Sequence, residues 1–546
     1  MLPEAESYEG LRAAFRWQVP ALYNMGVDVS DAQPPEALAL LALDPAGGER
    51  RLTFGDLARQ SNRIANLLRL LGLGRGDRVG VLLPQMPETA LAHIAAWKLG
   101  AVSIPLFTLF GPEALAYRLG DAGARLVVTD REGAAKLAPL RGGLPALERV
   151  LVVGAPDAGD GDLWGLAEAE AESFEPVATR ADDPALIIYT SGTTGQPKGA
   201  LHAHRVLLGH LPGVEMSHDL FPQPGDLVWT PADWAWIGGL LDVLLPALHH
   251  GVPVVACRFA KFTAEAAFEL IARYRIRNAF LPPTALKLMR AVEAPERRWD
   301  LAMRSIASGG ETLGAELLDW GRRVFGLTIN EFYGQTECNM VLSSCAALMP
   351  PRPGVIGRAV PGHQVAVVSE RGEPLAPGVQ GTIAVKAPDP VMFLGYWNDP
   401  AATEAKFAGG WLLTGDTGVA DAEGWIRFVG RDDDVITSAG YRIGPGEIED
   451  CLLRHPAVRL AAVVGKPDPQ RTEIVKAYLV LAEGRAGDAA LAGEIQAWVK
   501  SRLAAHEYPR EVAFVADLPM TTTGKIVRRE LREAARREAA EGAEHG

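Results

Sequence analysis

Residues 185–199, ALIIYTSGTTGQPKG, join a strand to a loop suited to phosphate. ALIIY is a short apolar run, which predicts a buried strand. The loop after it holds three glycines, several hydroxyl side chains and Lys198. Glycine allows unusual backbone angles, and N–H groups, hydroxyls and a lysine can together surround phosphate oxygens. No Gly-Lys-Ser/Thr ends the loop, so it is not a Walker A loop, and a surface linker is the alternative.

The composition around this loop is that of a large globular protein. The chain has 546 residues, 48% hydrophobic and 22% charged, and at about 150 residues per domain this predicts three to four units. Its 58 glycines and 39 prolines indicate many tight loops, where sites are often found. The net charge of −13 argues against a nucleic-acid partner. It leaves room for anionic small molecules, because backbone N–H groups can bind anions locally.

Cysteines and apolar segments point to a cytoplasmic protein. None of the four cysteines forms a CxxC pair, which argues against a zinc site or a disulfide framework. Residues 1–10 are acidic and lack a signal-peptide pattern. The most apolar stretch, residues 237–248, is interrupted by Asp242 and Pro246. It predicts a buried helix and no transmembrane segment.

The order of strand-like and helix-like segments predicts an α/β fold. Apolar strands at 77–84, 101–107 and 124–130 alternate with Ala/Leu-rich helical segments, which favours parallel or mixed sheets covered by helices. Short strands with Gly/Pro turns follow from about 360. We expect an N-terminal body of residues 1–432, made of two α/β subdomains and a small β-barrel-like subdomain from about 345 to 432. A small α+β domain follows at 433–546.

Six further segments follow the loop in a fixed order. They are SGGET (308–312), EFYGQTE (331–337), TGD (414–416), GRDDD (430–434), SAGYRIGPGEIE (438–449) and PMTTTGK (519–525). This set resembles the adenylate-forming (AMP-binding) superfamily of acyl-CoA synthetases, peptide-synthetase adenylation domains and firefly-type luciferases. The most similar members are short- and medium-chain acyl-CoA synthetases of the acetyl-CoA synthetase type. The resemblance covers roughly residues 50–535.

The resemblance implies an enzyme, an AMP-forming acid–thiol ligase. ATP and Mg²⁺ would convert a carboxylic acid to acyl-AMP, and CoA would then displace AMP. Both substrates of the first step are anions, so the site must neutralise charge. The resemblance also implies that the C-terminal domain is mobile, with Asp433 as its hinge. One pose would present Lys525, and the other would present the thiol-tunnel loop at residues 438–441.

The resemblance also assigns the nucleotide site. Asp416 would accept hydrogen bonds from the ribose hydroxyls, Arg431 would support the ribose, and Tyr333 would stack on adenine. The full set is Thr190, Ser191, Gly192, Thr193, Thr194, Gly195, Lys198, Gly310, Glu311, Glu331, Phe332, Tyr333, Gly334, Gln335, Asp416 and Arg431. Taken singly, several of these residues could equally be turn or core residues.

Four residues carry the predicted chemistry. Lys525 would bridge the carboxylate and the α-phosphate as a point charge. Thr336 would bond the α-phosphate or the acyl carboxylate, and Arg442 would contact the α-phosphate or act in the thioester pose. Glu337 would hold Mg²⁺, which prefers oxygen ligands. Without the resemblance, Lys525 would be taken as a solvated lysine and Glu337 as a helix-terminal acid.

The thiol and acyl sites are assigned less directly. CoA would contact Ala439, Gly440, Tyr441, Arg471 and Arg510. The acyl pocket would include Trp234 and Trp236, from VWTPADWAWIGG, together with Gly334. These tryptophans, like Trp229 and Asp233 nearby, could equally lie in the core. Acetate enzymes of the family carry a tryptophan where this chain has Gly334, so a larger acid is expected: short- to medium-chain, branched or aromatic.

Several alternatives remain open at this stage. The thiol could belong to a separate carrier protein, the acid could be aromatic, or the chain could be a catalytically silent nucleotide-binding protein. A luciferase-like oxygenase has no supporting feature. His202 and His204 could line the site or be structural. Two further partners are hypotheses: a second copy of the chain in a homodimer, and an acetyltransferase–deacetylase pair acting on Lys525.

Overall fold

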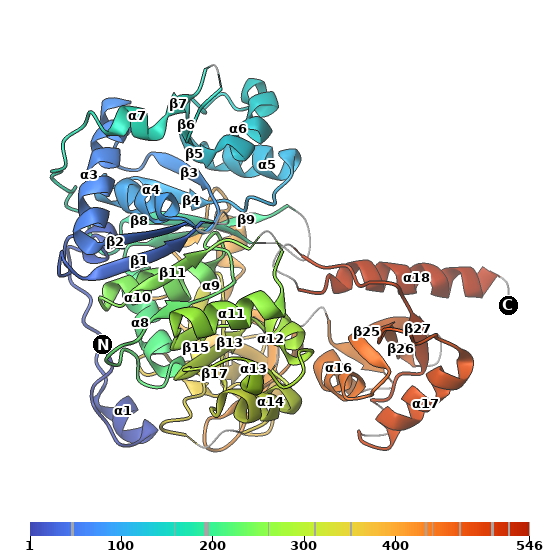
Figure 1. The fold of residues 1–546 in the computed structure, drawn as a ribbon. Helices are drawn as coiled ribbons and strands as arrows, with labels where there is room; N and C mark the ends of the chain where they lie inside the picture. Colours follow the sequence, from blue (N-terminus) through green and yellow to red (C-terminus); the bar gives the residue numbers. More distant parts are fainter. Residues whose placement is uncertain are drawn as a thin grey trace.

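The computed structural model describes most of the chain. The described residues are 1–44, 48–157, 159–190, 196–259, 261–310, 313–349, 352–431, 434–438, 441–468, 471–503, 507–521 and 525–544. They form a large N-terminal body with a smaller C-terminal unit beside it, drawn in orange and red (Figure 1). Among these residues, no helix is both long and apolar enough to span a membrane.

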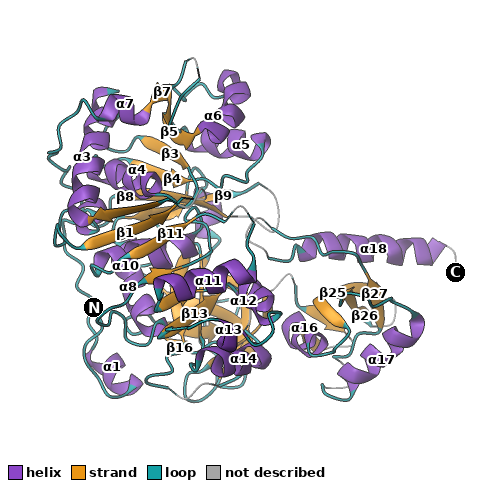
Figure 2. Ribbon diagram, in the orientation of Figure 1, coloured by secondary structure: helices purple, strands orange, loops and turns teal. Residues whose placement is uncertain are grey.

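The sheet that carries the phosphate loop is largely parallel and runs in the order β19-β9-β8-β4-β3-β5-β6-β7. Its strands are β3 (Arg78–Leu82), β4 (Val102–Pro105), β5 (Leu126–Asp130), β6 (Arg149–Val153), β7 (Gly161–Asp162), β8 (Pro184–Thr190), β9 (Lys198–Ala203) and β19 (Gly395–Tyr396). Helices lie on both sides of it (Figure 2). They are α3 (Phe54–Leu70), α4 (Pro87–Lys98), α5 (Pro112–Ala122), α6 (Arg131–Leu137) and α7 (Leu163–Ala167). This arrangement confirms the predicted α/β class.

A second sheet runs in the order β16-β15-β14-β13-β12-β10-β11-β1-β2. Its strands are β1 (Leu38–Leu43), β2 (Glu49–Thr53), β10 (Val228–Trp229), β11 (Val254–Cys257), β12 (Asn278–Phe280), β13 (Ser305–Gly309), β14 (Asn330–Gln335), β15 (Cys338–Ser343) and β16 (Arg358–Ala359). The helices of this half are α8 (Val206–Ser217), α11 (Ala264–Tyr274), α12 (Pro283–Arg290), α13 (Pro295–Arg298) and α14 (Ala315–Phe325). The largest core cluster takes residues from both sheets, so burial of apolar surface joins the two halves.

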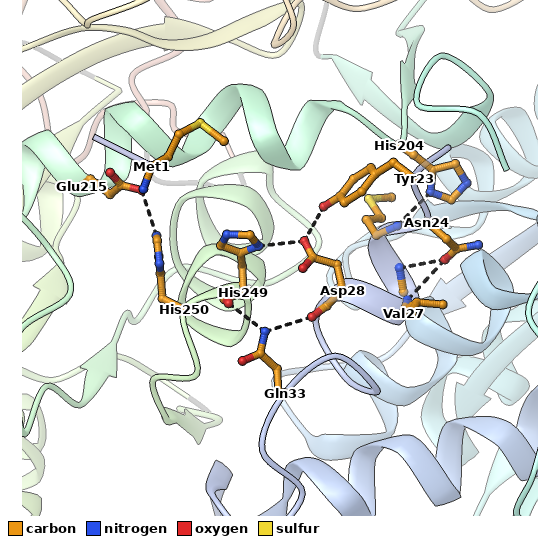
Figure 3. Close-up of polar contacts among 12 residues, drawn as sticks. Met1, Tyr23, Asn24, Val27, Asp28, Gln33, His204, Glu215, His249 and His250 are labelled. Carbon is orange, nitrogen blue, oxygen red and sulfur yellow. Dashed lines mark hydrogen bonds and ion pairs between the residues drawn. The ribbon is translucent and has the colours of Figure 1, made fainter. Parts of the chain in front are cut away.

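The apolar stretch that was predicted as a buried helix is helical throughout. It comprises α9 (Ile237–Gly239), a π-helical turn (Leu240–Leu244) and α10 (Leu245–His249). Figure 3 shows how polar groups tie α10 to the N-terminal segment: His249 Nδ1 lies 2.7 Å from Asp28 Oδ2, and Tyr23 donates to the same oxygen at 2.5 Å. Asp28 ends α2 (Met25–Asp28).

The antiparallel segments form two further sheets. One contains β17 (Val365–Val368), β18 (Gln380–Lys386), β20 (Phe407–Ala408), β21 (Trp411–Ala420) and β22 (Ile426–Arg431). The other contains β23 (Ile436–Ser438), β24 (Tyr441–Ile443), β25 (Val458–Asp468), β26 (Thr472–Leu481) and β27 (Glu511–Phe514), with α16 (Pro445–Leu453), α17 (Ala489–Lys500) and α18 (Arg528–Glu544). This C-terminal unit has its own core clusters, drawn entirely from residues after β22. Asp433 lies outside the described residues, so the boundary there stays a prediction.

Candidate active site

Two paired strands hold the ends of the phosphate loop. Thr190 ends β8, Lys198 begins β9, and these two residues face each other in the antiparallel register. The Thr190 hydroxyl donates to the Lys198 carbonyl oxygen at 3.4 Å. The loop residues Ser191, Gly192, Thr193, Thr194 and Gly195 lie outside the described part of the chain. Because of this pairing, the loop leaves the sheet at Thr190 and rejoins it at Lys198.

The predicted ribose carboxylate is buried and held by two neighbours from β14. Asp416, on β21, is 5% exposed. Its Oδ2 accepts hydrogen bonds from the Tyr333 hydroxyl at 2.5 Å and from Gln335 Nε2 at 2.6 Å. Arg431 is its register partner on β22. Burial raises the pKa of Asp416, whereas Tyr333 and Arg431 oppose that rise. Four residues that the sequence assigned to the nucleotide therefore lie together.

The turn between β14 and β15 carries the predicted metal ligand. Thr336 and Glu337 form this turn, since Gln335 pairs directly with Cys338. The Glu337 side chain is buried, and its Oε1 accepts a hydrogen bond from the Tyr396 hydroxyl. The Lys198 ammonium lies 5.1 Å from the centroid of the Tyr396 ring. Burial and the nearby Glu337 charge raise the pKa of Tyr396, so its hydroxyl stays protonated.

Lys525 reaches from the C-terminal unit into the body. Its ammonium lies 5.5 Å from the Trp236 ring centroid. A β-carbon placed on Gly310 would be 3.6 Å from Lys525 Nζ and 3.5 Å from the edge of Trp236. Gly310 has a φ of +99°, in the region that favours glycine. Lys525 and the segments predicted for the adenine and the acid thus meet at one place.

Glu331 and Phe332 are buried, and their assignment to the nucleotide stays a prediction. Glu331 accepts the Leu313 amide at 3.3 Å, and burial raises its pKa to about 8. The Phe332 ring lies 5.3 Å from that of Phe280 and packs beneath Gly309. Glu331 thus binds the backbone at Leu313, whereas Phe332 packs against Gly309 of the adenine-side segment.

The acyl-side tryptophans divide into core and site residues. Trp229 and Trp234 are fully buried, so Trp234 offers no surface to an acid in this structure and its pocket assignment is corrected. Trp236 is partly exposed and lies 5.6 Å from Phe280, ring to ring. Asp233 accepts the Ala235 amide at 2.8 Å, and burial raises its pKa to about 6. Trp236 is therefore the tryptophan that faces Lys525.

Gly334 does not border open space. A β-carbon there would lie 2.4 Å from Asn339 Oδ1 and from the Met340 amide nitrogen. The β14–β15 pairing brings this backbone against the glycine. A tryptophan at Gly334 would clash with this backbone and disrupt the hairpin. The interpretation that this glycine leaves room in the acyl pocket is therefore wrong for this structure.

Of the predicted CoA residues, Arg471 and Arg510 have described contacts, and those contacts lie within the C-terminal unit. Arg471 begins the approach to β26, and its amide donates to Asp468 at 2.9 Å. The Arg510 guanidinium lies 5.1 Å from the Tyr508 ring. Tyr441 and Arg442 fall on β24, but their side chains are outside the description. Glu311, Asp433, Ala439 and Gly440 lie outside the described residues altogether.

The two histidines after the phosphate loop are buried. Burial lowers the pKa of His202 to about 3 and that of His204 to about 4, so both are neutral. His204 Nδ1 accepts the Met25 amide at 3.3 Å, as Figure 3 shows. Its role is to hold the N-terminal segment on the body.

An acidic residue of the C-terminal unit lies against the N-terminus of a helix of the body. Gly314 is the N-cap of α14 and supplies no capping side chain. A β-carbon on it would lie 2.7 Å from Oδ2 of Asp450, which lies in the second turn of α16. Carboxylates are favoured at helix N-termini. Burial raises the pKa of Asp450 to about 6, and Lys287 and Arg454 oppose that rise. Sequence spacing carries no sign of this contact, which forms between two units.

We expect Asp450→Lys to slow acid-dependent pyrophosphate release by about 10-fold. A cation at a helix N-terminus beside Lys287 and Arg454 costs on the order of 1–2 kcal/mol, and it disfavours the pose that presents Lys525. Conversion of supplied acyl-AMP and CoA to thioester should keep its rate. Glu530→Lys, the same charge change at an exposed site on α18, is the control. Equal slowing of both half-reactions by Asp450→Lys would contradict the prediction.

The fold, the buried carboxylate of Asp416 and the C-terminal lysine together are those of an adenylate-forming enzyme. The family described as AMP-binding enzyme matches residues 27–397, and its C-terminal domain matches residues 447–525. The chain belongs to this family, and it is an acid–thiol ligase of the AMP-forming acyl-CoA synthetase type.

Relatives and solved structures cover nearly the whole chain. An acetyl-coenzyme A synthetase of Bacillus subtilis is 36% identical over 89% of this chain and 85% of its own. The mitochondrial acyl-coenzyme A synthetase ACSM2 of Rattus norvegicus is 35% identical over 94% of this chain and 92% of its own. A crystal structure of the anthranilate CoA ligase AuaEII with anthranoyl-AMP is 29% identical, with a TM-score of 0.88, over 96% of this chain and 99% of its own.

Proposed function

We propose that the chain activates a short- to medium-chain carboxylic acid, or an aromatic acid of similar size, and transfers it to CoA. The observation that carries this is the placement of Lys525 beside Trp236 and Gly310. A cation at this position can neutralise the carboxylate and the α-phosphate together. Trp236, which packs on the buried Phe280, supplies the apolar, aromatic side that favours a carbon chain or ring over acetate.

The remaining roles in the first half-reaction follow from the site. Asp416 binds the ribose hydroxyls while Tyr333 and Gln335 hold its orientation. Lys198 and the phosphate loop receive the phosphates, with Thr336 at the turn next to them. After pyrophosphate leaves, the C-terminal domain of residues 433–546 rotates about Asp433. Tyr441, Arg442, Arg471 and Arg510 then act on CoA.

Glu337 fits the requirements of a Mg²⁺ ligand. No cluster of three or more acidic, histidine or cysteine side chains suited to a metal occurs among the described residues. Mg²⁺ usually binds through one or two carboxylates and the phosphates of the substrate. The single buried carboxylate of Glu337 suits that mode. When bound, Mg²⁺ would neutralise charge on the phosphates.

Further biological assignments are proposals of the same kind. The four cysteines are free, which suits a reducing, cytoplasmic location. Acetylation of Lys525 would remove its charge and stop the first half-reaction. A homodimer of this chain is a further proposal. The family resemblance also allows a carrier-protein thiol in place of CoA.

The decisive experiment measures pyrophosphate release over a panel of acids, with and without CoA. The panel runs from acetate to decanoate and includes benzoate and anthranilate. CoA-dependent turnover with acids larger than acetate supports the proposal. Release without thioester formation favours a carrier-protein thiol, and a preference for acetate overturns the acid class. No release with any acid favours a silent nucleotide-binding protein.

A further inference from the structure

Tyr396 contacts both Glu337, the proposed metal ligand, and Lys198, the cation of the phosphate loop. It lies on β19, which pairs with β9 so that Tyr396 faces Ala200, two residues after Lys198. Its amide donates to the Thr403 hydroxyl oxygen at 2.8 Å, and its ring packs at 5.1 Å from Phe393. The backbone and the ring are therefore held in place independently of the hydroxyl group.

The hydroxyl of Tyr396 acts on Glu337. It donates to Oε1 of this carboxylate, which the turn between β14 and β15 presents. The Phe393 amide also donates to the Glu337 carbonyl oxygen at 2.8 Å, so the same segment holds the backbone of the turn. A hydrogen bond to one oxygen fixes the rotation of a carboxylate about its last bond. Ligand orientation by such outer partners commonly changes metal affinity 10–100-fold.

The ring of Tyr396 acts on Lys198. The ammonium lies 5.1 Å from the ring centroid, within the distance at which a cation is attracted to an aromatic face. The lysine side chain has four rotatable bonds and can place its ammonium group in many positions. The contact with the ring restricts these positions before the phosphates bind. One side chain thus touches both the proposed metal ligand and the cation of the phosphate loop.

We propose that Tyr396 is a positioning residue for phosphate activation: its hydroxyl orients Glu337, and its ring orients Lys198. The two charged groups, of opposite sign, then approach the triphosphate and its metal as one preorganised unit. This inference rests on the proposed function, since it takes the roles of Glu337 and Lys198 from there. It adds a residue that lies outside all the motifs in the sequence.

The test separates the hydroxyl from the ring by using Tyr396→Phe and Tyr396→Leu. Binding of ATP is measured by calorimetry over a range of Mg²⁺ concentrations, and pyrophosphate release is followed in parallel. The phenylalanine variant should raise the Mg²⁺ concentration for half-maximal binding about 10-fold, with little change in metal-free ATP binding. The leucine variant should also weaken metal-free ATP binding, by about 3-fold, because it loses the ring beneath Lys198.

A double-mutant cycle with Glu337→Gln isolates the hydroxyl effect. Adding Tyr396→Phe to Glu337→Gln should change the Mg²⁺ dependence no further. Tyr274→Phe, on α11 and away from the site, is the control for loss of a tyrosine hydroxyl. An unchanged Mg²⁺ dependence in Tyr396→Phe, or equal losses in both half-reactions with a lowered melting temperature, would overturn the inference. Failure of wild-type protein to release pyrophosphate, or of Glu337→Gln to alter the Mg²⁺ dependence, would instead refute the proposed function.

Discussion

Lys525→Ala should abolish acyl-AMP formation while leaving thioester formation from supplied acyl-AMP intact. In the first half-reaction, negative charge on the acid and on the α-phosphate must be brought together. Loss of a preorganised group that stabilises such charge commonly costs about 10²–10³-fold in rate. In the structure Lys525 lies beside Trp236 and Gly310, which places its ammonium between the acyl and adenine sides.

The split between the half-reactions is the informative result. In the proposed domain rotation Lys525 leaves the site, so we expect its absence not to affect the attack of the thiol. Both steps are measured separately: pyrophosphate release with acid and ATP, and thioester formation with acyl-AMP and CoA. Lys500→Ala removes a lysine from α17 and serves as the matched control. Comparable losses in both steps would remove Lys525 from its assigned role.

The elements whose structure depends on local apolar patterning were predicted correctly from the sequence. The strand before the phosphate loop is β8, and the apolar stretch after residue 236 is a buried helix. Both follow from apolar patterning over short distances. The motif residues Tyr333, Gln335 and Asp416 also meet as the family resemblance implied. Residue spacing alone could not have placed Asp416 against a strand some eighty positions earlier.

The failures come from contacts that only tertiary structure defines. Trp234 and Trp236 sit two residues apart in one irregular segment, and no periodicity tells which is buried. The space beside Gly334 is taken by Met340 because of the tight turn between β14 and β15. Tyr396 and Asp450 act on residues far along the chain. Side-chain identity is local information, whereas these neighbours are set by packing of whole elements.

Asp416→Asn should weaken the binding of both ATP and AMP by about 10²-fold. Hydrogen bonds to a charged group contribute about 1.5–3 kcal/mol each, and an unpaired buried donor costs a similar amount. Asparagine keeps the size of the side chain but loses the charge and one acceptor. Because we propose that the ribose stays bound in both half-reactions, we expect the rates of both to fall. Lys525→Ala should lower only the first. Calorimetric binding of ATP and AMP and the two rate assays measure this.

The pH dependence adds an independent check on Asp416. Burial raises the pKa of this carboxyl above its ordinary value, despite Tyr333 and Arg431 nearby. The ionised form, which accepts both ribose hydrogen bonds, is present above that pKa and is lost as the pH falls through it. Wild-type AMP affinity should therefore fall on acidification at a higher pH than an exposed aspartate would give, whereas the Asn variant should lack this component. Identical pH profiles for the two proteins would show that the ribose is bound by another group.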